Sequence, residues 1–403
     1  MIKSIKLIFT SILFIISLFW SINLRDPHLL TIRENEFIYL FVVLSLIALI
    51  TLSFKSRKTR FGTWLILTIL IINLIFSEIY FRHIKQTILH NPSETHRLIN
   101  SQLIIGFNDF NEIQKLSLNE IAGIFITQRN IKGKNLTEIK NFIAKLQNER
   151  KHFGLPPLII TTDQEGGPVS RLSPLIERQP SLNSLTERHN SREMAYEYGN
   201  KQGRLLSNIG INVNFGPVVD LKPSKPPEAL DFHTQINTRA IASSPAKIID
   251  IALPYIDGLE KNGVIATLKH FPGLGKVNSD THHFSAELDI PVSELLKSDW
   301  LPFSIITTRT NAWMMLSHVI LKQVDGINPV STSKKVVDNI IRKKLGFQGI
   351  LVTDDLTMGA IYNKGFCKSV LKAYSIDIDY LLIAYDYEKY YDAVDCLNSY
   401  IES

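Results

Sequence analysis

Three long apolar stretches dominate the first eighty residues of the chain. Residues 7–24, 37–54 and 62–78 run almost without charge, each for close to the length that crosses a bilayer as a helix. The first stretch could be a signal peptide, and all three could be buried helices of a soluble domain. No small-residue cleavage pattern follows the first stretch, however, and two more come directly after it. The pattern therefore predicts a membrane anchor over residues 1–81 with three transmembrane helices.

The basic residues that flank these stretches predict how the anchor is oriented. Lys3 and Lys6 precede the first stretch, and four Lys or Arg residues fill positions 55–60 between the second and third. Basic flanks of short loops face the cytoplasm. The third stretch then carries the rest of the chain out of the cytoplasm, although Arg82 and Lys85 argue in the opposite direction. We expect a multi-pass membrane protein in contact with the lipid bilayer, with its larger domain extracytoplasmic.

The remainder of the chain alternates short apolar runs with longer amphipathic stretches. A polar linker at residues 82–97, interrupted by Pro92, leads into residues 98–403. Eight apolar runs occur, at residues 102–107, 123–127, 158–162, 213–218, 264–268, 313–316, 350–353 and 380–384. The intervals between them have room for helices, as at residues 136–153, 191–208, 245–262 and 333–345. This alternation predicts the α/β class, as a single (β/α)8 TIM-type barrel.

Charge and cysteine content narrow the classes of function. The net charge of +6 and the pI near 9.0 could indicate a nucleic-acid partner. The basic residues are instead largely explained by membrane flanks and scattered surface positions, so no nucleic-acid binding is expected. Cys367 and Cys396 are too few for a disulfide framework or a four-cysteine zinc site, and we expect them to be packing thiols rather than a bridge. No metal or organic cofactor is expected.

Ionisable residues follow four of the eight apolar runs. The third run ends at Asp163, the fifth at Lys269 and His270, the sixth at His318 and the seventh at Asp354. Any one of them could be a helix cap or a solvated turn. The carboxyl ends of barrel strands meet at one mouth, however, where catalytic residues lie. Their convergence predicts a site at this mouth.

The loop after the fifth run adds a carboxylate close to an imidazole. Pro272 and two glycines end the run, and Asp280 then precedes His282 by two residues. At this spacing a carboxylate can orient and charge a histidine ring. A polar surface loop is the alternative interpretation.

Five motifs, in order, resemble glycoside hydrolase family 3, and more narrowly its β-N-acetylglucosaminidase (β-N-acetylhexosaminidase) branch. They are TTDQEGG at 161–167, NVNFGPVVDL at 212–221, KHFPGLG at 269–275 with the following Asp-x-His, MLSHVIL at 315–321, and LGFQGILVTDDLTMGA at 345–360. The resemblance covers nearly all of the chain after about residue 98. It does not cover the three apolar stretches.

The resemblance implies retaining, exo-acting hydrolysis of a terminal β-linked N-acetylglucosamine, with cell-wall fragments or related glycans as the carbohydrate substrate. It implies Asp354 as the nucleophile that forms a glycosyl-enzyme, and His282 as the general acid/base, oriented by Asp280. His283 is the rival for the acid/base role. Asp355 is expected to be structural, because adjacent strand residues point to opposite faces.

The same resemblance implies a set of residues that hold the hydroxyls of the terminal sugar. Asp163, Arg239, Lys269 and His270 match this set, Arg171 is a weaker candidate, and His318 is either a substrate contact or a wall residue.

Three departures from the family pattern bear on this implied site: Leu274 stands in place of a histidine, Pro168 in place of an arginine and Asn237 in place of a glycine. They leave open a weakened activity or a shifted substrate. Phosphorolysis and a catalytically silent glycan-binding membrane module remain the alternatives.

Overall fold

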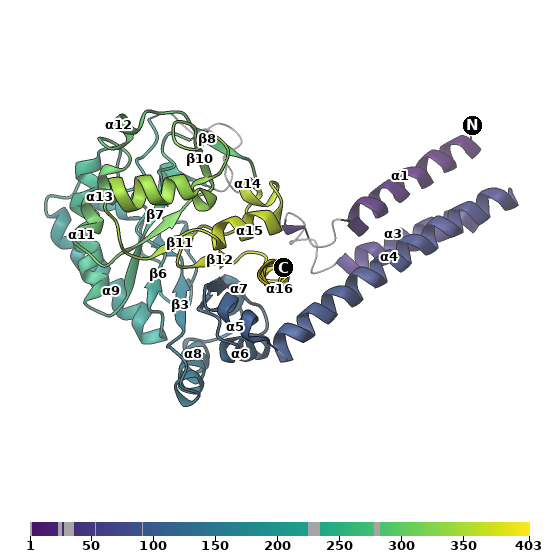
Figure 1. The fold of residues 1–403 in the computed structure, drawn as a ribbon, viewed down its shortest axis with the longest axis horizontal. Helices are drawn as coiled ribbons and strands as arrows, with labels where there is room; N and C mark the ends of the chain where they lie inside the picture. The colour runs from purple at the N-terminus through teal and green to yellow at the C-terminus, as the bar shows by residue number, and fades with distance from the viewer. Residues whose placement is uncertain are drawn as a thin grey trace. The chain divides into compact units, whose positions relative to one another are not determined.

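The computed structural model describes residues 2–22, 26–27, 36–52, 54–90, 92–224, 234–277 and 283–403 of the chain. The protein divides into two compact units, Met1–Asn91 and Pro92–Ser403 (Figure 1).

Within its described residues, the N-terminal unit has three α-helices, α1 (Ile2–Ile22), α3 (Glu36–Leu52) and α4 (Arg57–His90). Each of the three predicted apolar stretches lies largely within one of them. In the described part of the chain, α4 is the one helix long and apolar enough to cross a membrane, with a mean hydropathy of 2.1 over its most apolar window. The apolar portions of α1 and α3 are shorter, Ile8–Phe19 and Leu40–Leu52.

The outer surface of this unit is apolar, unlike that of a water-soluble bundle. Leu13, Ile47 and Leu67 meet at its centre, where the hydroxyls of Ser17 and Thr51 are also buried. Each of these hydroxyls donates to the backbone carbonyl four residues earlier, at 2.9 and 2.7 Å. Large apolar side chains face outward instead, among them Ile8, Phe9, Ile12, Ile15, Phe19, Phe41, Leu49, Leu52, Trp64, Ile69, Ile72 and Phe76.

The second unit is built on an eight-stranded parallel sheet that curls into a barrel. Its strands are β1 (Leu103–Ile105), β2 (Gly123–Phe125), β3 (Ile159–Thr162), β6 (Val213–Asn214), β7 (Ile265–Phe271), β9 (Trp313–Leu316), β11 (Leu351–Thr353) and β12 (Leu381–Ile383). Strands adjacent in this order pair with each other up to β11, and β12 pairs with β1. A parallel bridge between Val352 and Tyr380 connects β11 to the segment entering β12 and nearly closes the ring. The predicted α/β barrel is confirmed, and each of the eight predicted runs overlaps one strand.

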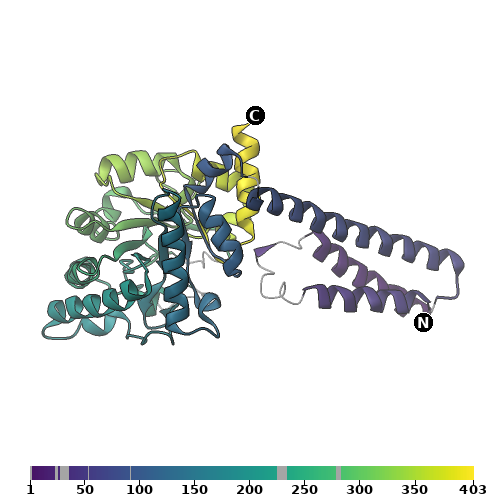
Figure 2. The same cartoon turned by 90° about the horizontal axis from the view of Figure 1, so that it is seen from below.

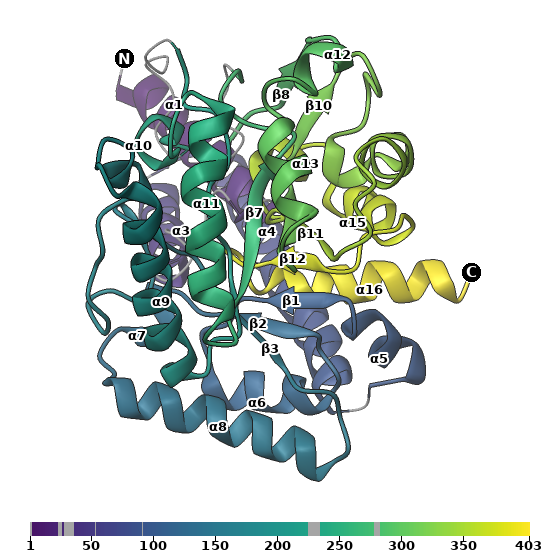
Figure 3. The same ribbon diagram turned by 90° about the vertical axis from the view of Figure 1, so that its left-hand side faces the viewer.

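Helices form the outer layer of the barrel, as the turned views show (Figure 2 and Figure 3). They are α5 (Glu94–Asn100), α6 (Phe110–Leu118), α7 (Gln128–Ile131), α8 (Leu136–His152), α9 (Ser191–Ile209), α10 (Ile236–Arg239), α11 (Pro245–Glu260), α12 (Val292–Leu295), α13 (Leu301–Thr307), the π-helix η4 (Val336–Lys344), α14 (Gly359–Tyr362), α15 (Phe366–Tyr374) and α16 (Lys389–Ile401). Local sequence sets their starts. At α8, for example, the Asn135 side chain accepts from the Glu138 amide, and the Glu138 carboxylate accepts from the Asn135 amide.

The barrel interior is filled by apolar side chains. The mouth is therefore closed from below by packed side chains, and no channel runs through the described barrel. Phe125 and Phe215 stack with ring centroids 5.7 Å apart, and Trp313 and Tyr380 stack at 5.2 Å. Two short sheets lie outside the ring. The hairpin of β4 (Gln164–Gly166) and β5 (Val169–Ser170) follows β3, while β8 (Ala286–Leu288) and β10 (Val319–Leu321) pair in parallel.

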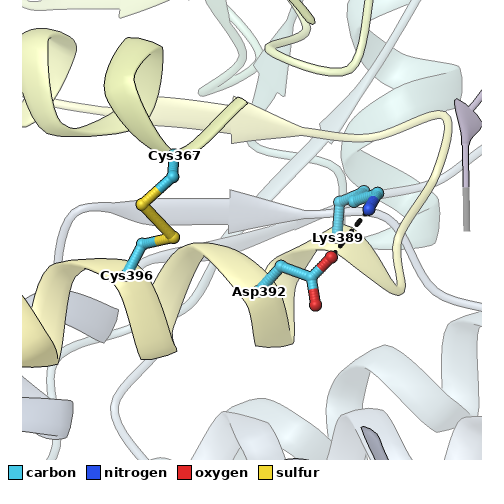
Figure 4. The surroundings of a disulfide bond; sticks show 4 residues. All are labelled: Cys367, Lys389, Asp392 and Cys396. Carbon is cyan, nitrogen blue, oxygen red and sulfur yellow. Dashed lines mark hydrogen bonds and ion pairs between the residues drawn. A yellow bond between two sulfur atoms is a disulfide. The ribbon is translucent and has the colours of Figure 1, made fainter. Parts of the chain in front are cut away.

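The two cysteines form a disulfide, so the prediction of two packing thiols is wrong. Cys367 lies on α15 and Cys396 on α16, with Cα atoms 5.7 Å apart, and Figure 4 shows the bond beside the Lys389–Asp392 ion pair. The two helices pack against each other and bring together residues 29 positions apart in the sequence. This packing was not visible in the spacing of the two residues.

Candidate active site

The polar residues that follow the barrel strands lie at one end of the barrel. All eight strands run in parallel, so their carboxyl ends share one mouth. Asp163 follows β3, Lys269 and His270 lie near the end of β7, His318 follows β9, and Asp354 follows β11. The architecture therefore places these predicted residues around a common rim.

An irregularity in β7 allows the side chains of two consecutive residues, Lys269 and His270, to lie at the same barrel mouth. Neighbouring residues of a regular strand face opposite sides of the sheet. The register between β7 and β9 shifts between Leu268 and Phe271, a β-bulge that spans Lys269 and His270. Both side chains consequently contact residues from neighbouring strand ends.

Glu165 is the centre of a buried ion-pair cluster. Arg239, on α10, donates to both of its carboxylate oxygens, at 2.7 and 2.9 Å, and the Lys269 ammonium lies 2.6 Å from Oε1. The same ammonium donates to Asp163 Oδ1 at 2.7 Å. Burial alone would raise the pKa of Glu165, but the Arg239 and Lys269 cations outweigh it and hold this pKa far below its usual range. Glu165 was not among the predicted site residues; its signal was its position two residues after Asp163.

His270 is held in one tautomer by its two neighbours. Its Nε2 lies 3.2 Å from Arg239 Nη2, and a guanidinium can only donate, so Nε2 accepts. Its Nδ1 therefore carries the proton and donates to Asp220 Oδ2 at 2.7 Å. We infer this tautomer from the hydrogen-bond network.

Asp220 is fully buried and also fixes the backbone of the β7 loop. It accepts from the His270 amide at 3.1 Å and from the Leu274 amide at 2.9 Å. Sequence reasoning missed Asp220, although it is the second-to-last residue of the NVNFGPVVDL motif. Leu274 is buried, and the hydrogen bond from its backbone amide to Asp220 holds the start of this loop in place despite the changed side chain.

The other two departures lie beside this cluster without breaking it. Pro168 occupies the turn between β4 and β5, and Asn237 lies on α10, two residues before Arg239. Arg171 is 46% exposed, with Nε 4.0 Å from Asp163 Oδ2. The cluster combines donors from two cations with acceptors from two carboxylates, which suits a hydroxyl-rich ligand.

Asp354 and Asp355 have different surroundings at the end of β11. Asp354 Oδ1 accepts from the Asp355 amide at 2.9 Å. The carboxylate of Asp355 is buried and accepts from the amides of Thr357, Ala384 and Tyr385 at 3.0, 3.2 and 2.6 Å. Burial raises the pKa of Asp355, while these backbone donors oppose the rise. Its contacts are those of a residue that joins β11 to β12.

His318 follows β9 and is buried, with both ring nitrogens near protein groups. Its Nε2 donates to the Asp355 carbonyl at 2.9 Å, and its Nδ1 lies 2.7 Å from the Ser331 hydroxyl, which donates to it in this tautomer. Both ring nitrogens thus bind protein groups.

The predicted acid/base residues Asp280 and His282 lie outside the described residues. Their neighbour His283 is described, and its carbonyl accepts from Asn363 Nδ2 at 3.4 Å. Among the residues that the structure describes, no three His, Cys, Asp or Glu side chains are grouped to hold a metal ion.

The fold and the site define a barrel enzyme whose mouth suits a hydroxyl-rich ligand. Residues 99–402 match the Glycosyl hydrolase family 3 N terminal domain. The chain belongs to this family and is a glycoside hydrolase.

Individual relatives agree with this assignment. The chain is 32% identical to a β-hexosaminidase of Haemophilus influenzae over 291 residues. This aligned region covers 71% of this chain and 79% of the relative. It is similar to a solved family 3 β-N-acetylglucosaminidase of Paenibacillus sp. str. FPU-7, with 27% identity, a TM-score of 0.69, and coverage of 77% of this chain and 58% of that one. It is also similar to NagZ of Neisseria gonorrhoeae in complex with N-trifluoroacetyl-D-glucosamine, with 29% identity, a TM-score of 0.62, and coverage of 73% and 83%.

Replacement of Glu165 by Gln tests the ion-pair cluster. The change leaves two buried cations short of a counter-charge, and we expect it to lower the free energy of unfolding by about 3 kcal/mol at pH 7. The folded pKa lies below the ordinary value of 4.5, so the contribution of Glu165 is fully present above about pH 4.5. It is lost as the pH falls from there toward the folded pKa, so the gap between variant and wild type should narrow in acid.

Denaturant unfolding at several pH values measures this gap. The matched control is Glu177→Gln, which breaks an exposed pair with Lys201 and should cost less than about 0.5 kcal/mol. Equal stability of Glu165→Gln and wild type at pH 7 would contradict the proposed role of the cluster.

Proposed function

We propose that the protein is a retaining exo-β-N-acetylglucosaminidase that removes terminal β-linked N-acetylglucosamine from cell-wall (peptidoglycan-derived) fragments or related glycans. The observation that carries the proposal is the connected cluster of Asp163, Glu165, Arg239, Lys269 and His270, at the same barrel mouth as Asp354. The names of the relatives support the substrate class, and the N-acylated glucosamine bound by the Neisseria protein supports the sugar.

The reaction follows two displacements at the anomeric carbon. The Asp354 carboxylate attacks this carbon and forms a C–O bond, while His282 protonates the departing glycosidic oxygen, whose bond to the carbon breaks. Neutral His282 then takes a proton from water, which attacks the glycosyl-enzyme and releases Asp354. Asp280 orients the ring and stabilises its charged form. The anomeric configuration is retained because it is inverted twice.

The sugar hydroxyls are the proposed ligands of the cluster. Asp163 and Lys269 can share a pair of neighbouring hydroxyls, since one accepts and the other donates. Arg239 binds a further hydroxyl, and the partly exposed Arg171 adds a donor at the rim. His270, whose two ring nitrogens bind Arg239 and Asp220, holds Arg239 in place for this contact. His318 contributes the wall beside Asp354.

An aryl-glycoside assay tests the proposed reaction on the full-length protein. We expect 4-nitrophenyl β-N-acetylglucosaminide to release its chromophore, with free N-acetylglucosamine as the sugar product whether or not phosphate is present. Formation of N-acetylglucosamine 1-phosphate in the presence of phosphate would show that the enzyme is a phosphorylase instead. Saturable binding of the sugar without turnover would show a silent glycan-binding module.

Residues 1–81 are the proposed membrane anchor with three spans, residues 82–97 the linker, and residues 98–403 an extracytoplasmic catalytic domain. The outward apolar side chains and inward hydroxyls of α1, α3 and α4 support the anchor, because helices in lipid place small and polar groups at their contacts. The Cys367–Cys396 disulfide supports an extracytoplasmic location of the catalytic domain, because disulfides persist in oxidising compartments.

The redox state of the two cysteines in cells tests this placement. In cells quenched with acid and denatured, we expect neither Cys367 nor Cys396 to react with a thiol-alkylating reagent until a reductant is added. Addition of reductant should then add two alkyl groups to the protein mass. Two groups added without reductant would place the barrel in the cytoplasm.

A further inference from the structure

Tyr385 presents an exposed aromatic ring directly after the last barrel strand. Its side chain is 51% exposed. The other strongly exposed aromatic side chains of the described barrel are Phe153, Phe284 and Tyr400. Phe153 and Tyr400 lie at the carboxyl ends of α8 and α16, the end of the barrel opposite to the mouth. Phe284 lies in the segment between β7 and β8, and its ring contacts that of His283. Tyr385 follows β12 at the mouth itself and has no such ring contact with the described residues.

The position of β12 in the ring places Tyr385 across the mouth from the sugar-binding cluster. The cluster comes from β3, from the segment after β6, and from β7, the third, fourth and fifth strands of the ring. Asp354 follows the seventh strand, and Tyr385 follows the eighth. In the proposed binding mode, the terminal sugar lies over the third to fifth strands with its anomeric carbon at Asp354, and its leaving group extends toward the eighth strand.

The backbone of Tyr385 is fixed from two sides. Its amide donates to Asp355 Oδ2 at 2.6 Å, one residue from Asp354. Its carbonyl accepts from both terminal nitrogens of Arg129, each at 3.2 Å, and Arg129 lies on α7 after β2. The Arg129 guanidinium also lies 5.4 Å from the ring centroid of Tyr387. The ring at position 385 therefore projects from a rigid support.

The tyrosines that follow in the same segment have structural contacts that Tyr385 lacks. Tyr390 and Tyr391 are buried, and their hydroxyls donate to Asn100 at 2.9 Å and to Glu112 at 2.5 Å. The Tyr385 side chain makes no hydrogen bond or ring contact with the described residues. Packing and hydrogen bonding within the fold do not account for an aromatic ring at this position.

We propose that Tyr385 forms a leaving-group subsite that binds the pyranose ring on the reducing side of the cleaved bond. A pyranose has an apolar C–H face and a polar edge, which match the flat ring and the hydroxyl of a tyrosine. Asp355 and Arg129 are positioning residues that hold this platform. The inference rests on the proposed glycosidase activity and adds that the enzyme favours a sugar as the leaving group.

Two substrates with the same terminal sugar test the subsite on the full-length protein in detergent. N,N′-diacetylchitobiose has a sugar as its leaving group. The β-fluoride of N-acetylglucosamine has the same terminal sugar, but its leaving group is a fluoride ion. We expect Tyr385→Ala and Tyr385→Leu to lower the ratio of kcat/KM for the disaccharide to kcat/KM for the fluoride about five- to tenfold. Tyr385→Phe keeps the stacking ring and should stay within about twofold of wild type. Tyr400→Ala is the matched control, because Tyr400 is 57% exposed at the opposite end of the barrel, and it should leave the ratio unchanged.

The outcomes separate this inference from the proposed function. Turnover of both substrates with an unchanged ratio in Tyr385→Ala and Tyr385→Leu would overturn the subsite and leave the glycosidase standing. Turnover of the fluoride alone by wild type would also overturn the subsite. Turnover of neither substrate would overturn both. Because the ratio compares two substrates on one preparation, partial loss of folded protein does not change it.

Discussion

Asp354→Asn should lower kcat/KM for 4-nitrophenyl β-N-acetylglucosaminide by a factor of about 10⁴ or more. An amide has nearly the shape of a carboxylate, but it carries no charge and does not form the glycosyl-enzyme. The Asp355 amide can still donate to the amide oxygen, so the variant should fold normally. Initial rates and circular dichroism on the same preparations measure both effects.

The matched control is Asp250→Asn, an exposed residue that pairs with Arg192 on the outer helices. Its turnover should equal that of wild type. Wild-type turnover in the Asp354 variant would show that another residue is the nucleophile.

His282→Ala should lower kcat/KM for N,N′-diacetylchitobiose about 10²- to 10⁴-fold, because a sugar alcohol leaves poorly without a proton donor. The loss in the first step should be much smaller for the aryl glycoside, whose leaving group departs as a stabilised phenolate. Azide should then raise turnover of the aryl glycoside by the variant, because this anion attacks the glycosyl-enzyme without a general base. The glycosyl azide product identifies that route.

His283→Ala is the comparison that decides between the two neighbouring histidines. It should retain turnover of both substrates within about threefold. If His283→Ala showed the larger loss and the azide rescue, the acid/base role would belong to His283 and Asp280 would orient a different ring.

The barrel could be predicted because its signals are local. Each strand is a short apolar run, and helices fill the intervals between runs, so all eight strands overlap their predicted positions. The strand ends could then be placed at one mouth by topology alone, which correctly grouped Asp163, Lys269 and His270. The contacts among these residues needed the structure.

Glu165 and Asp220 could not be assigned from sequence because their importance lies in contacts made far along the chain. Glu165 binds Arg239, which lies 74 residues later in the sequence, and Asp220 binds His270, which lies 50 residues later. The disulfide was missed for a related reason, since it depends on how α15 packs on α16. The bulge that turns Lys269 and His270 to the same mouth also left no mark in the apolar pattern.

The N-terminal unit shows what hydropathy predicts and what it does not. The three apolar stretches correctly marked three helices, and α4 has the length and apolarity of a membrane span. Hydropathy did not show that Ser17 and Thr51 would turn toward the centre of the bundle. That arrangement is an independent reason to propose lipid around these helices.

Trapping of the covalent intermediate tests the central claim most directly. A 5-fluoro analogue of N-acetylglucosamine with a good leaving group slows the second displacement and allows the glycosyl-enzyme to accumulate. Mass spectrometry of the digested protein should find one added sugar, on the peptide that contains Asp354, and none in the Asp354→Asn variant. A sugar attached elsewhere, or turnover of the analogue with no covalent adduct at any time, would contradict the account.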